Sequence, residues 1–180
     1  QELQLLQQSM QILYNVTSID LSSGEDIDPS IRCIAIINPA DSIPSYALDK
    51  LDDYISKGGN VAVAYNNVTG DFQSMQGGVL NTGISNWLLT KGVAVNKDFV
   101  LDASAASVTV QQRQGFFTVN SQVEFPFFPM IKVFEEHPIT KGIEQVAFQM
   151  VSSIDASGNN NYSFTPLIKT SQNTAVQSPP

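Results

Sequence analysis

Two apolar segments separated by one amphipathic segment limit the fold of this chain most strongly. Residues 31–37 (IRCIAII) form a nearly continuous β-branched run, which is typical of a strand buried on both faces of a parallel sheet. A helical pattern follows Pro44 and ends at Gly58 and Gly59, since glycine adopts the left-handed conformation that ends helices. Residues 61–65 (VAVAY) form the second apolar run. This order predicts a strand–helix–strand crossover and therefore a mostly parallel sheet covered by helices.

Weaker patterns flank this crossover. The first residues place apolar side chains at helical spacing, and residues 16–21 predict a short strand. A third helix is expected between Thr82, whose hydroxyl can cap its start, and Gly92. Because the pattern requires one more strand before the first helix, we expect that strand to lie upstream of Gln1.

The second half of the chain is richer in strand patterns. Residues 108–112 and 116–119 flank the turn sequence Arg-Gln-Gly at 113–115, which predicts a β-hairpin. Further expectations are strands at 146–151 and 164–169 and a loop at 69–78. The predicted architecture is an α/β first half with a β-hairpin-rich second half laid on the same sheet.

Composition predicts a single globular domain and excludes a nucleic-acid partner. With 180 residues, of which 42% are hydrophobic, the chain can fill the core of a single domain, residues 1–180. Its formal net charge is −8 and it has no run of Lys or Arg, which excludes a nucleic-acid partner. Because the chain starts inside a helical pattern and ends in Ser-Pro-Pro, we expect a soluble piece excised from a longer, membrane-anchored protein.

Candidates for catalysis are few and scattered. Cys33 lacks the Gly-x-Cys-x-Gly elbow of a nucleophile and is expected to point into the core. His137 is the single histidine, and Ser153 follows it without a glycine elbow. Nothing near His137 in the sequence supplies both a nucleophile and an orienting group, so a structural or exposed loop position is expected. The sequence therefore predicts no catalytic residue.

Metal and cofactor sites are not indicated either. Asp26 and Asp28 lie in an acidic loop, but a calcium loop needs further ligands and a central glycine. One cysteine and one histidine do not make a transition-metal site. The glycine pairs at 58–59 and 77–78 match neither a dinucleotide fingerprint nor a phosphate-binding loop. We therefore expect no cofactor and no metal.

An aromatic segment, FPFFP at residues 125–129, is the strongest candidate for a contact surface. In one interpretation its rings close the edge of the core. In the other, the prolines hold the rings partly exposed as anchors for a partner, and the nearby hairpin offers an edge strand. The candidate partner-binding residues are Phe125, Phe127, Phe128 and His137.

Several segments resemble those of one known family. They are NTGISNWLL at 81–89, GVAVNKDFVLD at 92–102, FPFFP at 125–129, HPITKG at 137–142, SSID at 152–155 and TPL at 165–167. In this order they resemble the soluble domain of the auxiliary component of gliding-motility-type ABC transport systems (GldG-like), with Phe125 in a position where the family has tyrosine. The resemblance covers most of the chain from about residue 31 onward.

The resemblance implies a three-layer, flavodoxin- or amidotransferase-like fold related to a domain of intraflagellar transport proteins. It implies a periplasmic-side domain, flanked by membrane helices, in a Bacteroidetes-like bacterium. ABC permease and ATPase subunits would be its partners, and no catalytic residue is carried over. The function we expect is non-enzymatic: contact with the membrane partner, and capture of a ligand, in a system related to gliding motility.

Two other classes of function stay open. An amidotransferase-like or small-sugar hydrolase-like enzyme would use Cys33 or Ser153 together with His137. A carbohydrate-binding domain would use Tyr and Trp side chains, although Trp87 lies on a predicted core face. Labelling by an active-site probe would identify the enzyme, and glycan binding lost in Trp87→Ala would identify the carbohydrate-binding domain.

Overall fold

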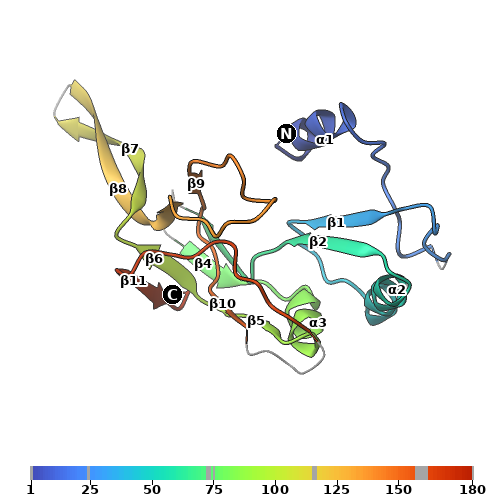
Figure 1. The fold of residues 1–180 in the computed structure, drawn as a ribbon. Coiled ribbons are helices and arrows are strands. Elements are labelled where there is room, and N and C mark those ends of the chain that lie inside the picture. The colour runs from blue at the N-terminus through green and yellow to red at the C-terminus, as the bar shows by residue number, and fades with distance from the viewer. Residues whose placement is uncertain are drawn as a thin grey trace. The chain divides into compact units, whose positions relative to one another are not determined.

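The computed structural model describes residues 2–23, 25–71, 74, 76–114, 117–156 and 162–179 (Figure 1). The helices are α1 (Glu2–Gln11), α2 (Ser45–Ser56) and α3 (Ile84–Thr90). The strands are β1 (Cys33–Ile37), β2 (Asn60–Ala64), β3 (Val68–Asp71), β4 (Gln76–Val79), β5 (Val93–Val95), β6 (Phe99–Asp102), β7 (Ala105–Gln114), β8 (Phe117–Ile131), β9 (Val146–Ala147), β10 (Ile154–Ala156) and β11 (Thr174–Gln177). The chain divides into two compact units. Unit 1 comprises Gln1–Ile34 and Ser45–Val61, and unit 2 comprises Ala35–Pro44 and Ala62–Pro180.

The predicted strand–helix–strand crossover is confirmed as β1–α2–β2. The Asn60 N–H donates to the Arg32 carbonyl (3.3 Å) where both strands begin, and the Asn38 N–H donates to the Ala64 carbonyl (2.8 Å) where both end. Bonds that join start to start and end to end make the pair parallel. The predicted glycine stop is also confirmed, because α2 ends at Ser56 and Gly58 has a φ of +91°.

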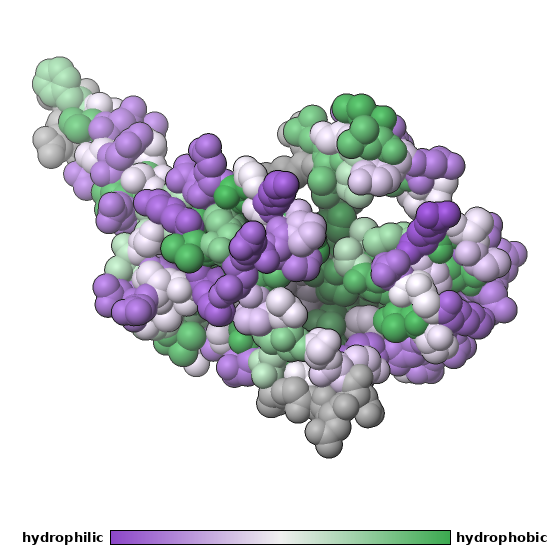
Figure 2. Space-filling model, viewed as in Figure 1, coloured by the Kyte–Doolittle hydropathy of each residue, from purple (hydrophilic) through white to green (hydrophobic). Residues whose placement is uncertain are grey.

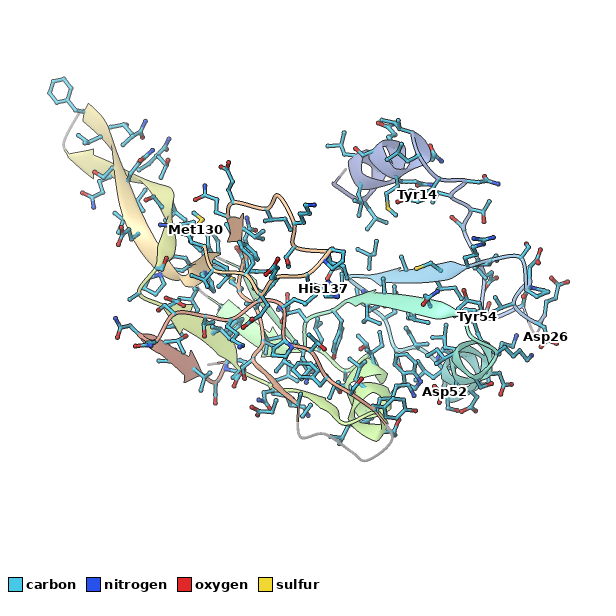
Figure 3. All side chains as sticks on the ribbon, viewed as in Figure 1. Tyr14, Asp26, Asp52, Tyr54, Met130 and His137 are labelled. Carbon is cyan, nitrogen blue, oxygen red and sulfur yellow. The ribbon has the colours of Figure 1, made fainter. Side chains whose placement is uncertain are left out.

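Helix α2 supplies most of the core of unit 1. Its buried face consists of Ala47, Leu48, Leu51 and Tyr54. The Tyr54 hydroxyl, labelled in Figure 3, donates to the carbonyl of Ile31 (2.9 Å), so the ring packs inside while its polar end is satisfied.

Unit 2 is built differently from the prediction. Its strands form small antiparallel sheets, β3–β4, β5–β10, β6–β11 and β7–β8–β9. A mostly parallel, flavodoxin- or amidotransferase-like three-layer sheet is therefore wrong. The physical reason is connection length. Parallel neighbours need a crossover of a dozen or more residues, whereas four residues separate β3 from β4.

Several element predictions fail for related reasons. Residues 16–21 form no strand, and the expected loop at 69–78 contains the β3–β4 ladder that pairs Val68 with Val79. The strand expected at 146–151 shortens to β9, and the one at 164–169 reduces to a single bridge from Ile168 to Phe134. Cys33, expected in the core, is exposed because only one neighbouring strand pairs with β1 among the described residues. The hairpin is confirmed, as β7–β8, but is much longer than predicted.

Thr82 does not cap α3 as expected. The residue at the N-cap is Gly83, with a φ of +82° and no side-chain capping bond. The Thr82 hydroxyl is buried and has no hydrogen-bond partner within the described part of the chain. Its backbone carbonyl is used instead, since it accepts from the Ile43 N–H (2.9 Å). The remaining predicted features of α3, a buried Trp87 and an end before Gly92, are confirmed.

A group of polar side chains joins the parts of unit 2, and we call it the polar joint. Its members are Asn66, Asn67, Asn96, Asp98, Ser152 and Ser153. The Asn66 side chain accepts from the Ser152 N–H (2.7 Å) and donates to the Met150 carbonyl (2.6 Å). Asp98 accepts from both the N–H (3.0 Å) and the hydroxyl (2.9 Å) of Ser153. These bonds fix residues 150–153, which form no strand, to the turns after β2 and β5.

A second polar contact holds the C-terminal segment. Asp102 is 1% exposed, and its Oδ1 accepts from the Ser104 N–H (2.8 Å) and the Ser171 hydroxyl (2.6 Å), while Oδ2 accepts from the Ser171 N–H (2.7 Å). Burial raises the pKa of this carboxyl, but the hydrogen bonds from Ser171 and Ser104 outweigh burial and hold its pKa below 3.8. The charged form is therefore favoured, and it ties residue 171 to the end of β6.

We predict that Asp102→Asn lowers the free energy of unfolding at pH 7 by about 1–3 kcal/mol, because an amide cannot accept at both atoms and leaves a buried donor unpaired. Folding lowers the pKa of the Asp102 carboxyl. Its contribution to the free energy of unfolding is therefore complete above pH 3.8 and is lost as the pH falls through the lower pKa of the folded state. Urea unfolding at pH 7 and below pH 3.8 measures both effects. Asp41→Asn, at an exposed residue of the same unit, is the control. Equal stability of the Asp102 variant and the native chain at pH 7 would contradict this role.

Candidate functional site

The aromatic segment predicted from the sequence forms a cluster in unit 2. The ring centroids of Phe125 and Phe127 are 5.3 Å apart, and those of Phe125 and Phe128 are 5.1 Å apart in an edge-to-face arrangement. Phe127 also contacts the buried ring of Phe99 edge to face at 5.8 Å. Such pairs are favourable arrangements of aromatic rings. All three predicted rings are half-buried, so each serves the core and the surface together.

A break in the β7–β8 ladder produces this cluster. Ala105 pairs with Pro129 and Ser107 pairs with Glu124, which leaves residues 125–128 opposite Ala106 alone. Extra residues on one strand bend it and redirect its side chains. Pro126 and Pro129 suit this position because proline, which lacks an N–H, is tolerated in a sheet at bulges.

Beside the cluster lies a small pocket, which we call the aromatic pocket. Its volume is about 170 Å³. The residues that line it are Gly70, Asp71, Gln76, Gly77, Phe99, Phe125, Phe127, Met150 and Gln177. Rings and a thioether form the apolar part, whereas two amides and one carboxylate form the polar part. This arrangement fits an apolar group of roughly side-chain size with a polar edge.

Two glycines make room for the apolar part of the pocket. Gly70 and Gly77 pair with each other across the β3–β4 ladder. A Cβ on Gly70 would lie 2.3 Å from the Met150 sulfur, and one on Gly77 would lie 2.9 Å from two atoms of the Phe99 ring. The missing side chains therefore let the thioether and the ring lie directly on the backbone of the ladder.

The pocket contains little that could move a proton. Its one carboxylate, Asp71, accepts a hydrogen bond from the Ser74 hydroxyl (2.8 Å). Gln76 and Gln177 are neutral donors and acceptors. The pocket can thus bind and orient a group, whereas the described residues of its lining include no histidine, cysteine or lysine that could act as base or nucleophile.

His137 does not line this pocket, although the sequence analysis grouped it with the aromatic segment. It lies in the loop after β8 (Figure 3), where its Nδ1 accepts from the Ile139 N–H (3.2 Å). Thr140, which is buried, closes the same loop by donating to the carbonyls of Glu135 (2.6 Å) and His137 (3.0 Å). These bonds give His137 a position in a turn.

Within unit 2, the structure does not bring the enzyme candidates Ser153 and His137 together. The Ser153 hydroxyl donates to Asp98 and accepts from the Asn96 amide (2.9 Å), so its partners belong to the polar joint rather than to His137. Trp87, the candidate sugar platform, is 7% exposed, and Lys91 covers its ring at 4.5 Å. A buried indole offers no open face for a sugar.

In the acidic loop, Asp28 accepts from the Ser30 N–H (2.7 Å), which is a local turn. No group of three or more His, Cys, Asp or Glu side chains in the described ranges could hold a metal ion. The helices of the described ranges are all too short or too polar to span a bilayer.

Sequence reasoning found two residues of the pocket and missed the others. Phe125 and Phe127 were predicted. Of the others, Phe99 comes from β6, Met150 from the segment that follows β9, and Gln177 from β11. Only the three-dimensional pairing of distant segments brings these side chains together. The glycines at 77–78 were one available signal, because glycine inside a strand marks the close approach of another group.

We predict that Gly77→Ala lowers the free energy of unfolding by about 1–3 kcal/mol, because the new methyl group would overlap the Phe99 ring. Gly78→Ala is the matched control on the same strand, since its Cβ would lie 3.9 Å from the nearest atom, a methyl carbon of Thr69. The control is expected to be neutral or more stable by up to about 1 kcal/mol, through reduced entropy of the unfolded chain. Thermal unfolding of both variants tests the pair, and an equal loss in both would contradict the proposed contact.

Comparisons with known proteins show a similar fold and a family. Comparison with curated proteins gave no match. Among solved structures, the mmIFT52 N-terminal domain is similar, with a TM-score of 0.58 at 13% sequence identity, over 94% of this chain and 70% of that chain. At this identity the similarity concerns the fold alone. The family model described as "ABC-type uncharacterized transport system" matches residues 1–180. The chain therefore belongs to this family of auxiliary components of ABC-type transport systems.

Proposed function

We propose that this chain is a non-enzymatic, periplasmic-side contact module of an ABC transport system, and that the aromatic pocket is where it engages a protein partner. Membership of the auxiliary family implies association with ABC transporter components. The permease is the component proposed here, because it is the one that a domain on the periplasmic side can reach. ATP hydrolysis would belong to the ATPase subunit.

The observation that carries this proposal is the chemistry of the aromatic pocket. Its lining combines two half-buried rings and a thioether with neutral amides, which is how interfaces hold an apolar anchor residue. Ser153, one of the catalytic candidates, is engaged in the hydrogen bonds of the polar joint. Binding by shape is therefore better supported than a reaction.

The finer assignment to the gliding-motility type, in a Bacteroidetes-like bacterium, is part of the same proposal. It rests on the resemblance of the segments at 81–102, 125–129 and 137–142, which are quoted above. Loss of gliding on deletion of the gene would support it. Normal gliding with loss of transport would leave the contact function intact and remove the link to motility.

We predict that Gln76→Arg reduces co-purification of the permease with the tagged full-length protein by at least about tenfold, which corresponds to about 1.4 kcal/mol. The residue is exposed at the edge of the pocket, so a charged side chain there would obstruct an apolar anchor without disturbing the core. Gln122→Arg, at an exposed position on β8 outside the pocket, is the matched control. Unchanged capture by both variants would refute this use of the pocket.

We also predict that a membrane-impermeant maleimide labels Cys33 in spheroplasts, because the thiol is exposed and the domain is proposed to lie outside the cytoplasm. Cys33→Ser in the full-length protein shows which part of the labelling comes from this residue. Labelling that requires lysis of the cells would place the domain on the cytoplasmic side and reject the proposed location.

A further inference from the structure

The β7–β8 hairpin has one apolar and one polar face. Its register pairs Val108 with Val123, Val110 with Ser121 and Gln112 with Val119. Directly opposed residues and every second residue point to the same side, so these pairs share one face. The alternating pairs, Ser107–Glu124, Thr109–Gln122 and Gln111–Asn120, are polar throughout and form the other face. We call Val108, Val110, Phe117, Val119 and Val123 the hairpin strip.

The hairpin strip is open to solvent in large part. Phe117 is 76% exposed, Val123 48% and Val119 42%. The hairpin extends as an arm from the rest of unit 2 (Figure 1), and hydrophobic atoms are visible at its far end (Figure 2). An isolated two-stranded ribbon is marginally stable in water at best. An arm of this length with one apolar face therefore gains stability when a second surface covers that face.

Charge indicates which second surface covers the apolar face of the hairpin. Residues 105–131 contain one arginine and one glutamate, so the hairpin has no net charge, whereas the whole chain has a net charge of −8. Net charge therefore opposes contact between two copies, and the hairpin is an extended part that a second copy can approach without meeting net like charge. Anionic membranes are poor partners, since the strip lacks the lysines and arginines that attract a protein to them.

We propose that the hairpin strip is covered by the hairpin strip of a second copy of this chain. The contact would be isologous, with the same apolar residues meeting across a two-fold axis, which is the commonest symmetry of soluble oligomers. Two ribbons facing each other at the usual spacing of about 10 Å form a small four-stranded sandwich. The polar faces then remain in water, and each arm obtains the second layer that it lacks alone.

The experiment measures the mass of the full chain by sedimentation over a range of concentrations. We expect a reversible dimer that tightens as salt increases, because salt screens repulsion between copies of charge −8 but leaves apolar contact intact. Val119→Thr with Val123→Thr should raise the dissociation constant at least about tenfold, while β-branched threonine keeps the strand preference. Asn120→Thr with Gln122→Thr, on the polar face, is the matched control and should leave it unchanged.

Three results would overturn the proposal. They are a monomer at every concentration, a dimer equally weakened by both double variants, and a monomer that binds anionic phospholipid vesicles through Val123. The first does not depend on how any variant folds. Since the transporter is absent from this experiment, its outcome is independent of permease capture by the aromatic pocket.

Discussion

Residues 150–153 form no strand, and side-chain hydrogen bonds add to the backbone hydrogen bonds that join them to Phe127, Val100 and Asn96. The Asn66 amide accepts from the backbone of residue 152 and donates to that of residue 150, so it replaces a peptide group of a paired strand. This contact also holds Met150 at a φ of +49°, an uncommon conformation for a residue with a side chain. Because the Met150 thioether lies against Gly70 in the aromatic pocket, the pocket depends on the polar joint.

The segments that resembled a known family largely coincide with these structural contacts. Asn96 and Asp98, from one such segment, bind Ser153, from another. Asp102 likewise binds Ser171. A buried polar group that loses its partner costs stability, so residue types at both ends of such a bond are constrained together. The resemblance therefore rests in part on residues that hold the fold, and the family model supports its coarser content, an ABC-type transport system.

Local sequence patterns made the strand–helix–strand crossover predictable, whereas the pairing of distant strands was not. The crossover from residue 33 to residue 64 follows from apolar runs, helical spacing and a glycine stop, all of which act over a few residues. By contrast, β6 pairs with β11 and β5 pairs with β10 across roughly 60 to 80 residues, and such pairings leave no local pattern. The same limit applies to the site, since Phe125 and Phe127 were apparent while Phe99 and Gln177 were not.

The β7–β8 hairpin is longer than predicted because its ladder continues past a break. Prolines at 126 and 129 normally indicate that a strand has ended. Here the ladder breaks instead, with residues 125–128 facing Ala106, and pairing resumes at Pro129. The break separates two kinds of surface on one strand. Before it, alternation produces an apolar and a polar face along the arm, and within it the Phe127 ring turns toward Phe99. A continuous ladder would keep the rings in the same alternation as the strip, and the pocket would lose its wall.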